Sequence, residues 1–341
     1  MAKPFYYGGQ AVMEGVMMRG RTSMAVGVRA PDGQIVVYEE ALIPGPVLTK
    51  VRNVPFLRGA IVLWDTLLLG MRALIFSANV GLQEESDDVT DQVKQGEDPA
   101  ILSGPLLWLT VAMSLLFSIA LFFVAPLVAI DILDRWIESH AVVNLIEGVI
   151  RISLLVGYML LIGRMEDIRR VFGYHGAEHM TINAYESNLP VDVDHVRDQP
   201  LTHIRCGTGF LLIVVLISVA IFMLVGRPVW YLLYGSRIVL VPFIAAIGYE
   251  VIRFGAAHTS NRFVRMMLAP GLALQSVTTR QPDDAMMEVS IAAFKRVLAT
   301  DGVISEFELD PNVVAVDTAG RPVGLVRDPE PVGVAAADVL A

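Results

Sequence analysis

Two uninterrupted apolar stretches dominate the pattern of hydrophobic and polar positions along the chain. Residues 99–130 include no charged side chain over 32 positions, and residues 206–226 include none over 21. A helix of about 20 apolar residues is long enough to cross the hydrocarbon core of a bilayer. Two further apolar stretches lie near residues 142–163 and 238–253. The pattern therefore predicts an α-helical integral membrane protein in which four transmembrane helices form a bundle within residues 103–254.

The second of these four helices carries two charges in the middle of its apolar sequence. Glu147 and Arg151 are four residues apart, so they lie on one face of a helix and can pair. Ionisable groups within membrane helices usually point toward the bundle interior, away from lipid. We expect this pair to hold the bundle together rather than to take part in chemistry.

Residues 56–82 are also apolar, but three charges recur within them at seven-residue intervals. These are Arg58, Asp65 and Arg72. That interval keeps the three side chains on one narrow stripe of a helix. A helix that lies in the membrane interface, or that packs on the bundle, explains the stripe better than a full span does.

The N-terminal region 1–55 has the pattern of a small soluble module. Two runs rich in β-forming residues, 22–29 and 34–40, flank Pro31-Asp32-Gly33. Proline, aspartate and glycine in this order are typical of a turn, so the region predicts a β-hairpin.

The remaining segments are polar or mixed in character. Residues 83–102 are rich in acidic residues and predict a solvated linker. Residues 255–300 predict a cytoplasmic segment with an amphipathic helix over 282–300, preceded by a turn at 268–272, where proline and glycine are adjacent. Residues 301–341 lack any period, and their composition is typical of a disordered tail.

Composition and charge narrow the class of protein. The chain is 54% hydrophobic with a mean hydropathy of +0.57, which excludes an ordinary soluble domain of this size and makes the lipid bilayer its expected partner. The net charge is −9. No basic cluster is interleaved with aromatic residues, so nucleic acid is not an expected partner. The N-terminus lacks the apolar core of a cleaved signal peptide.

The distribution of basic residues predicts the orientation in the membrane. The connection 164–205 contains five arginines, and the first 104 residues contain nine Lys or Arg. The two other connections contain one and two arginines. Because basic residues are enriched on the cytoplasmic side, both termini and the 164–205 loop are expected to face the cytoplasm, in a multi-pass protein of the plasma (inner) membrane.

The main candidate for chemistry lies in that loop, which holds four of the six histidines of the chain. His175, Glu178 and His179 form the sequence His-x-x-Glu-His, the signature of inverzincin metalloproteases. On a helix, residues four apart share a face, so His175 and His179 can bind one divalent metal ion. Glu178 is then the expected catalytic residue, as the base that takes a proton from a metal-bound water. The alternative is a structural histidine pair.

Other residues are candidates for completing the metal shell. His203 and Cys206 have a chelating His-x-x-Cys spacing at the start of a span, and a histidine with a thiolate favours zinc. As the only cysteine, Cys206 has no internal disulfide partner and is either a metal ligand or a small buried residue. Glu250 lies near the end of the fourth span, where it either ligates the metal or pairs with Arg253.

Several longer motifs match a known family. They are Tyr7-Gly8-Gly9-Gln10-Ala11-Val12-Met13-Glu14-Gly15-Val16-Met17, Pro55-Phe56-Leu57-Arg58-Gly59, Tyr174-His175-Gly176-Ala177-Glu178-His179, Asn188-Leu189-Pro190, Arg205-Cys206-Gly207 and Glu288-Val289-Ser290-Ile291-Ala292. Over about residues 6–300 the chain resembles the YqhQ-like family of bacterial membrane proteins, with the domain of unknown function DUF1385. The family is described as predicted metal-dependent enzymes of unknown activity. The resemblance therefore implies a metal and leaves the substrate open. It also makes Glu14, otherwise a solvated turn residue, a further candidate.

Two functional interpretations follow. In the first, the chain is a membrane-bound metal-dependent hydrolase with His175 and His179 as ligands and Glu178 as general base. In the second, it is a non-enzymatic scaffold or regulator, because His203 and Cys206 fill the remaining two positions of a closed structural site. A transporter is the weakest interpretation, since the four spans contain few charges and no visible repeat.

Overall fold

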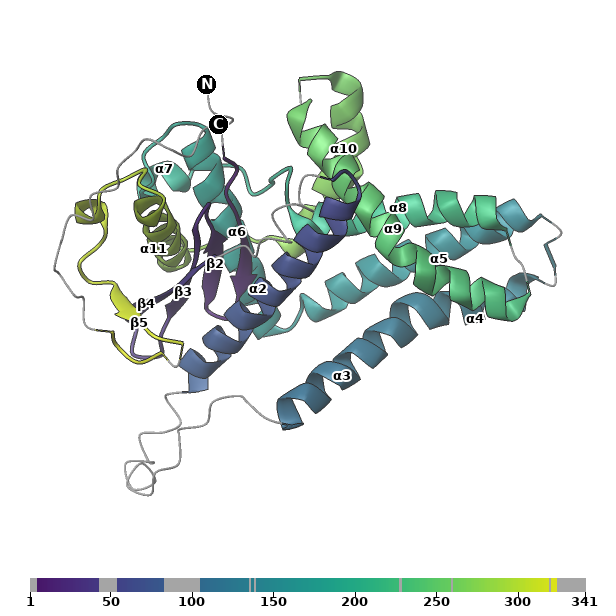
Figure 1. Ribbon diagram of the computed structural model, residues 1–341, viewed down its shortest axis with the longest axis horizontal. Helices are drawn as coiled ribbons and strands as arrows, with labels where there is room; N and C mark the ends of the chain where they lie inside the picture. Colours follow the sequence, from purple (N-terminus) through teal and green to yellow (C-terminus); the bar gives the residue numbers. More distant parts are fainter. Residues whose placement is uncertain are drawn as a thin grey trace.

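The computed structural model describes residues 5–42, 54–82, 105–134, 136–137, 139–226, 229–258, 260–318 and 320–323. Within these ranges the chain forms an α/β domain at one end and a bundle of long helices at the other (Figure 1). The predicted acidic linker 83–102 and the tail after residue 323 lie outside the described residues.

The α/β domain is built on a five-stranded sheet in the order β1-β2-β3-β4-β5. The strands are β1 Gly8–Val12, β2 Gly15–Arg19, β3 Ser23–Arg29, β4 Ile35–Ala41 and β5 Val314–Val316. The first four are antiparallel neighbours, and β5 joins β4 in parallel. The predicted hairpin is confirmed as β3–β4, where Gly33 has a φ of +87°.

The sequence prediction missed the first hairpin, β1–β2. Its strands are joined by a two-residue turn, Met13-Glu14, so that Val12 pairs with Gly15. Glu14 has a φ of +51°, in the left-handed region that tight hairpin turns require and that glycine, asparagine or aspartate normally occupies. The turn therefore lacks its usual sequence signal.

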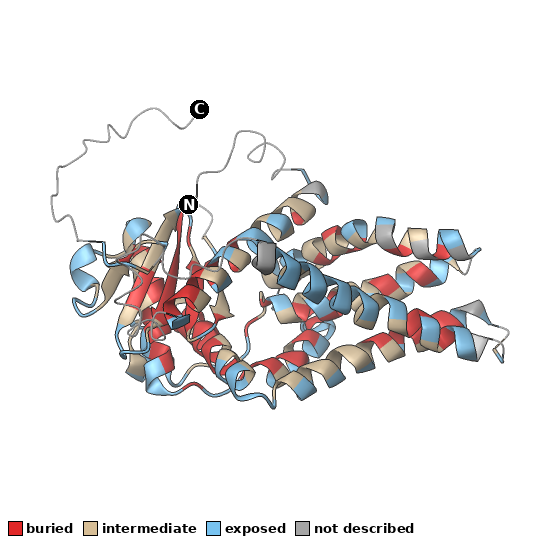
Figure 2. Ribbon diagram, turned by 90° about the horizontal axis from the view of Figure 1, so that it is seen from below, coloured by how far each residue is buried: buried red, intermediate tan, exposed pale blue. Residues whose placement is uncertain are grey.

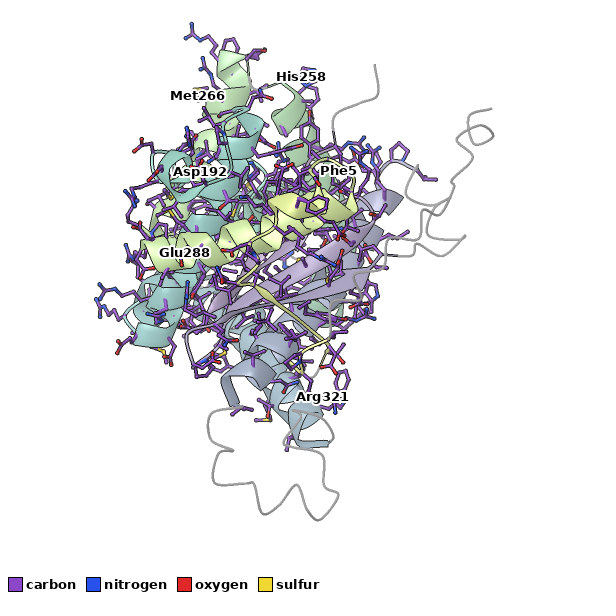
Figure 3. All side chains as sticks on the ribbon, turned by 90° about the vertical axis from the view of Figure 1, so that its left-hand side faces the viewer. Phe5, Asp192, His258, Met266, Glu288 and Arg321 are labelled. Carbon is purple, nitrogen blue, oxygen red and sulfur yellow. The ribbon has the colours of Figure 1, made fainter. Side chains whose placement is uncertain are left out.

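Helices cover both faces of the sheet (Figures 1 and 3). On one face lie α6 Glu166–Glu186 and α11 Asp284–Thr300, packed against Val16 and Met18 of β2. The other face packs on α2 Leu57–Leu82, which contributes Phe76 and its apolar neighbours one and two turns away. Because successive residues of a strand point to opposite faces, burial on both sides explains why β2 is apolar at nearly every position.

The connection 164–205, predicted as a loop, is mostly helical. It contains α6 and the short helix α7 Val193–Val196. The alternation of apolar and polar positions that usually marks a helix is weak in α6, because several of its polar residues are buried against other segments. Thr181, for example, is fully buried and bonds Ser290 of α11 at 2.8 Å.

The predicted disordered tail starts too early. Residues 314–316 form β5, and Val316 is only 5% exposed against β4 and the α2 side of the sheet. A strand of only three residues becomes ordered because the edge of β4 offers unpaired backbone groups and an apolar neighbour. The order of residues 314–316 therefore depends on pairing with β4 and could not be predicted from local composition.

The long helices of the bundle are α3 Pro105–Ile119, η3 Ala120–Val124, α4 Ala125–Asp134, α5 His140–Ile162, α8 Gly207–Val225 and α9 Trp230–Ala257. The π-helical turn η3 joins α3 and α4 into one apolar rod. Large apolar side chains on these helices are exposed, including Trp108 at 65% and Leu224 at 89% (Figure 2). Exposed apolar surface over whole helices fits a bilayer environment.

The inside of the bundle holds a charged network. Glu147 accepts a hydrogen bond from Arg151 at 2.9 Å, as the sequence predicts, and a second from Arg237 of α9 at 3.1 Å. All three side chains are buried. The network therefore ties α5 to α9, which a helical spacing rule applied to α5 alone could not show.

Among the described residues, five helices are long and apolar enough to span a membrane, where the sequence predicted four transmembrane helices. The additional one is α2. Each of its three regularly spaced charges has an ion-pair partner on another element. Asp65 pairs with Arg19 of β2, Arg72 with Glu40 of β4, and Arg58 with Glu250 of α9. The stripe is thus a packing surface.

The C-terminal segment contains two helices. The amphipathic helix predicted over 282–300 is confirmed as α11. The turn predicted at 268–272 is wrong, because α10 Arg262–Thr278 runs through Pro270 without interruption. Close packing of Gly271 against Gly209 of α8 holds α10 on the bundle at this point, which explains the Pro-Gly pair without a turn.

Candidate metal centre

Three potential metal ligands come together where the α/β domain meets the bundle. His175 and His179 lie one turn apart on α6, and Cys206 precedes the first residue of α8. One ligand atom from each lies within 4.8 Å of the others. The closest pair is His175 Nε2 and Cys206 Sγ at 3.2 Å. The structure thus unites the two histidines of the predicted motif with the only cysteine of the chain.

Each ligand is placed by local geometry. The helical repeat places the two imidazole rings next to each other in an edge-to-face arrangement, with their centroids 4.3 Å apart. Cys206 is the N-cap of α8, and its sulfur accepts a hydrogen bond from the Thr208 amide at 3.4 Å. This position puts the sulfur at the positive end of the α8 dipole.

Backbone carbonyls fix the proton on each imidazole. His175 Nδ1 donates to the Thr278 carbonyl at 2.9 Å, and His179 Nδ1 donates to the Leu201 carbonyl at 2.6 Å. A carbonyl can only accept, so each ring carries its proton on Nδ1 and keeps Nε2 free as a lone-pair donor. Histidines that bind metals in proteins commonly show this arrangement.

A glycine within the motif is also required. A Cβ on Gly176 would lie 2.2 Å from the Arg280 carbonyl oxygen, so only glycine lets the segment after α10 pass this close to α6. The last residue of α10, Thr278, lies just before that segment and carries the carbonyl that orients His175. Sequence reasoning missed Gly176, although its place inside the motif was a signal.

His203, a predicted ligand, does not join the group of three. Its Nε2 lies 3.5 Å from Glu186 Oε2 and 3.3 Å from Arg205 Nη2. Its ring is next to that of His179, with centroids 5.7 Å apart. Burial alone raises the pKa of Glu186, but the hydrogen bond with His203 and the Arg205 charge outweigh burial, so the Glu186 pKa lies below its ordinary value.

The main chain around His203 is held by a single side chain. Gln275 of α10, 1% exposed, accepts a hydrogen bond from the His203 amide at 2.9 Å and donates to the His203 carbonyl at 2.8 Å. These two hydrogen bonds fix the backbone of His203, three residues before Cys206. Gln275 is a second residue that the sequence alone did not single out.

Glu250 is likewise outside the group. It accepts two hydrogen bonds from the Arg58 guanidinium, one of them at 2.7 Å, and one from the Phe56 amide at 3.3 Å. Its carboxylate is therefore engaged with α2. The alternative partner considered from the sequence, Arg253, is replaced by Arg58, a residue 192 positions away.

Glu178 is 5% exposed and lies on the side of α6 that faces β1. Its Cγ would be 2.8 Å from a Cβ added to Gly9, so the two segments are in close contact there. Glu178 is not one of the three clustered residues, and its predicted role as a general base stays a prediction.

Glu14 also lies apart from the group. The Arg170 guanidinium donates to both Glu14 carboxylate oxygens, at 2.5 and 2.6 Å, and the Tyr174 hydroxyl donates at 3.3 Å. Burial, together with the Glu14 charge, raises the pKa of Tyr174. Glu14 therefore fastens the β1–β2 turn to the first half of α6, one turn before His175.

These features define a protein in which membrane-type helices carry an α/β domain with a His-His-Cys cluster at the junction. The chain belongs to the family described as "Protein of unknown function (DUF1385)", whose model matches residues 54–300. It is 32% identical over 305 residues to "Uncharacterized protein YqhQ" of Bacillus subtilis (strain 168), covering 88% of this chain and 94% of the relative. No solved structure is a significant match.

Proposed function

We propose that this chain is a membrane-bound metal-dependent hydrolase with His175, His179 and Cys206 as its metal ligands. The observation that carries the proposal is the convergence of these three side chains with both histidines held by carbonyls. Among the described residues, no fourth His, Cys, Asp or Glu belongs to the cluster. Three protein ligands with one open position are typical of catalytic rather than structural zinc sites.

The donor set favours zinc. Two imidazole nitrogens and one sulfur form a borderline-soft set that suits zinc better than magnesium or calcium, which prefer oxygen. When bound, zinc polarises a substrate carbonyl or phosphoryl oxygen and lowers the pKa of water to about 7. The chain's own contribution is to fix the imidazole orientation through the Thr278 and Leu201 carbonyls.

Proton transfer is assigned to Glu178. It lies on α6 between the two ligand histidines in sequence and is buried beside β1. Glu178→Gln should keep metal content and thermal stability but lower turnover about 100- to 10,000-fold, the usual contribution of a general acid or base. Turnover would be followed on a panel of ester, amide and phosphoester substrates. A metal-replete Glu178→Gln protein with full activity would rule out this role.

Metal content of purified protein tests the ligand set directly. Wild type should hold about one zinc per chain, and His175→Ala and Cys206→Ser should lose it. His203→Ala and Glu250→Gln serve as matched controls, because the first neighbours the cluster and the second is bound by Arg58. Metal-free wild type, or a Glu250→Gln protein that loses its metal, would refute the assignment.

The alternative function is a scaffold whose metal only locks α6 onto α8. His203, whose ring adjoins that of His179, favours it as a fourth ligand. Cobalt substitution separates the two functions without a known substrate. With an open position, added azide should change the visible spectrum of the cobalt protein, whereas four protein ligands leave no place for azide. An azide-insensitive spectrum that changes in His203→Ala would support the scaffold.

We further propose that α2 lies along the membrane interface while the other four apolar helices span the bilayer. One side of α2 packs on the sheet, and Trp64 and Leu67 on another side are 64% and 59% exposed. Both termini and α6 then face the cytoplasm, consistent with the arginine distribution. A cysteine introduced at the exposed Arg197 should resist impermeant reagents in intact cells. Labelling from outside would contradict this topology.

A further inference from the structure

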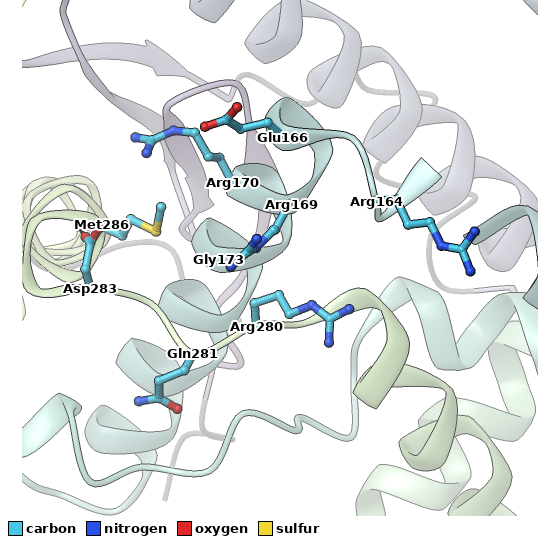
Figure 4. Close-up of a pocket in the computed structure, with 9 residues that line it drawn as sticks. All are labelled: Arg164, Glu166, Arg169, Arg170, Gly173, Arg280, Gln281, Asp283 and Met286. Atoms are coloured by element: carbon cyan, nitrogen blue, oxygen red, sulfur yellow. Dashed lines mark hydrogen bonds between the residues drawn. The ribbon is translucent and has the colours of Figure 1, made fainter. Parts of the chain in front are cut away.

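A broad cleft lies beside the metal centre, between the start of α6 and the connection from α10 to α11 (Figure 4). Its volume is about 750 Å³. The lining residues are Arg164, Glu166, Arg169, Arg170, Gly173, Arg280, Gln281, Asp283 and Met286. Four arginines against two acids in one cleft is an unusual concentration of positive charge for a chain with a net charge of −9.

Most of this positive charge is not compensated by nearby carboxylates. Arg170 is engaged by Glu14, and Asp283 accepts a hydrogen bond from the Met286 amide as the N-cap of α11. Among the described residues, Arg170 forms an ion pair with Glu14, and no ion pair involves Arg164, Arg169 or Arg280. All three side chains are exposed to solvent, so an anion can reach them.

The backbone around the cleft is rigidly placed. The Arg280 amide donates to the Phe172 carbonyl of α6 at 2.9 Å, and the Arg280 carbonyl lies against Gly176. Met286 of α11 packs directly on Gly173 of α6, because a Cβ on Gly173 would lie 2.7 Å from Met286 Sδ. In Figure 4, Arg169 projects from α6 and Arg280 from the facing connection. Arg169 and Arg280 therefore border the cleft from two different segments of the chain.

The cleft also lies at the end of an apolar helix. Arg164 follows α5 after its C-cap Gly163, and α5 is one of the helices long and apolar enough to span a bilayer. Figure 4 shows Arg164 on the side of the helical bundle. Phosphate groups of lipids lie at this depth of a membrane, and basic pockets beside membrane helices recognise them.

We propose that this cleft binds a phosphate group, carried either by a membrane lipid or by a soluble phosphate ester. Guanidinium groups bind phosphate oxygens through two parallel hydrogen bonds, which a lysine cannot reproduce. Arg169 and Arg280 supply the primary contacts, and Arg164 adds charge on the membrane side. The site is distinct from the metal cluster and does not require the metal.

The test is titration calorimetry on full-length protein in uncharged detergent at low, constant ionic strength. The probes are inorganic phosphate, glycerol 1-phosphate and short-chain phosphatidic acid. Arg169→Gln with Arg280→Gln should weaken binding at least tenfold, because each charge-assisted contact is worth about tenfold or more. The matched control is Arg21→Gln with Arg321→Gln, which removes the same charge outside the cleft and should bind as wild type does.

A conservative pair keeps the test informative if the neutral variant fails to fold. Arg169→Lys with Arg280→Lys retains the charge but not the planar fork, so it should fold and still lose several-fold in affinity. Tighter binding of phosphatidic acid than of glycerol 1-phosphate would identify a lipid source, and equal binding a soluble ester. Wild type without saturable binding, or a neutral variant that binds normally, would overturn the proposal. Loss of binding in Cys206→Ser would overturn it too, by placing the anion at the metal cluster.

Discussion

Replacing Glu147 by Gln is the sharpest test of how the helical bundle is held together. The Glu147 carboxylate is 3% exposed and accepts hydrogen bonds from Arg151 and Arg237 at 2.9 and 3.1 Å. Glutamine has nearly the same shape and can still accept one hydrogen bond, so the substitution removes charge with little change in packing. Two buried guanidinium groups would then lose their shared counter-charge.

The expected cost is large. Two unit charges about 4 Å apart attract by about 4 kcal/mol at an effective dielectric constant near 20. Repulsion between the two arginines and relaxation of the helices reduce the total, and breaking a buried pair typically costs about 3–5 kcal/mol. At roughly 2–4 °C per kcal/mol, the melting temperature should fall by about 6–20 °C.

The assay is thermal unfolding of purified protein in one detergent, with Glu288→Gln as the matched control. Glu288 bonds Arg29 at 2.9 Å, but its side chain is 53% exposed, and exposed pairs contribute about 0.2–1 kcal/mol. The two variants make the same chemical change in opposite environments. If Glu147→Gln melts within a few degrees of Glu288→Gln, the buried network does not stabilise the bundle and the reasoning is refuted.

Three further predictions concern the α/β domain. Gly9→Ala should lower the free energy of unfolding by about 1–3 kcal/mol through overpacking, because its Cβ would lie 2.6 Å from the Met17 carbonyl oxygen. The control is Gly8→Ala, which should melt like wild type because a Cβ there has nothing within 4 Å. Equal melting temperatures of the two variants would contradict the packing. Truncation after residue 312 removes β5 and with it the buried Val316 side chain, so the free energy of unfolding should fall by about 1.5–3 kcal/mol. Truncation after residue 323 should leave the melting temperature unchanged in the same assay. Glu186 has a pKa below its ordinary value of 4.5, so its stabilising effect is present above that pH and is lost as the pH falls through the lower folded value. The stability difference between wild type and Glu186→Gln should therefore shrink as the pH falls below the ordinary value of 4.5, and a difference that does not change in this acidic range would argue against the ion pair.

Much of the architecture could be derived from local sequence patterns. The apolar stretches gave the four bundle helices, the turn Pro31-Asp32-Gly33 gave the β3–β4 hairpin, and the amphipathic repeat gave α11. The spacing of His175 and His179 placed two imidazoles on one face of a helix. These features depend only on residues within a few turns of one another, so the periodicity of a helix or strand is enough to predict them.

Other local patterns gave the wrong answer because distant segments decide the outcome. The left-handed Glu14 turn has no glycine, and Pro270 lies inside a continuous helix. The strand β5 is ordered by the edge of β4. In each case a tertiary contact outweighs the conformational preference of the residue.

The sequence by itself determined the family of the protein, the helices that carry its apolar surface, and the placement of His175 and His179 on one face of a helix. Only the tertiary structure decided which other residues join that pair. In the folded chain Cys206 contacts His175, His203 contacts Glu186, and Glu250 forms an ion pair with Arg58. The physical reason is that the centre and its α/β domain are assembled from segments far apart in the chain, and no spacing rule relates residues that meet only when those segments pack.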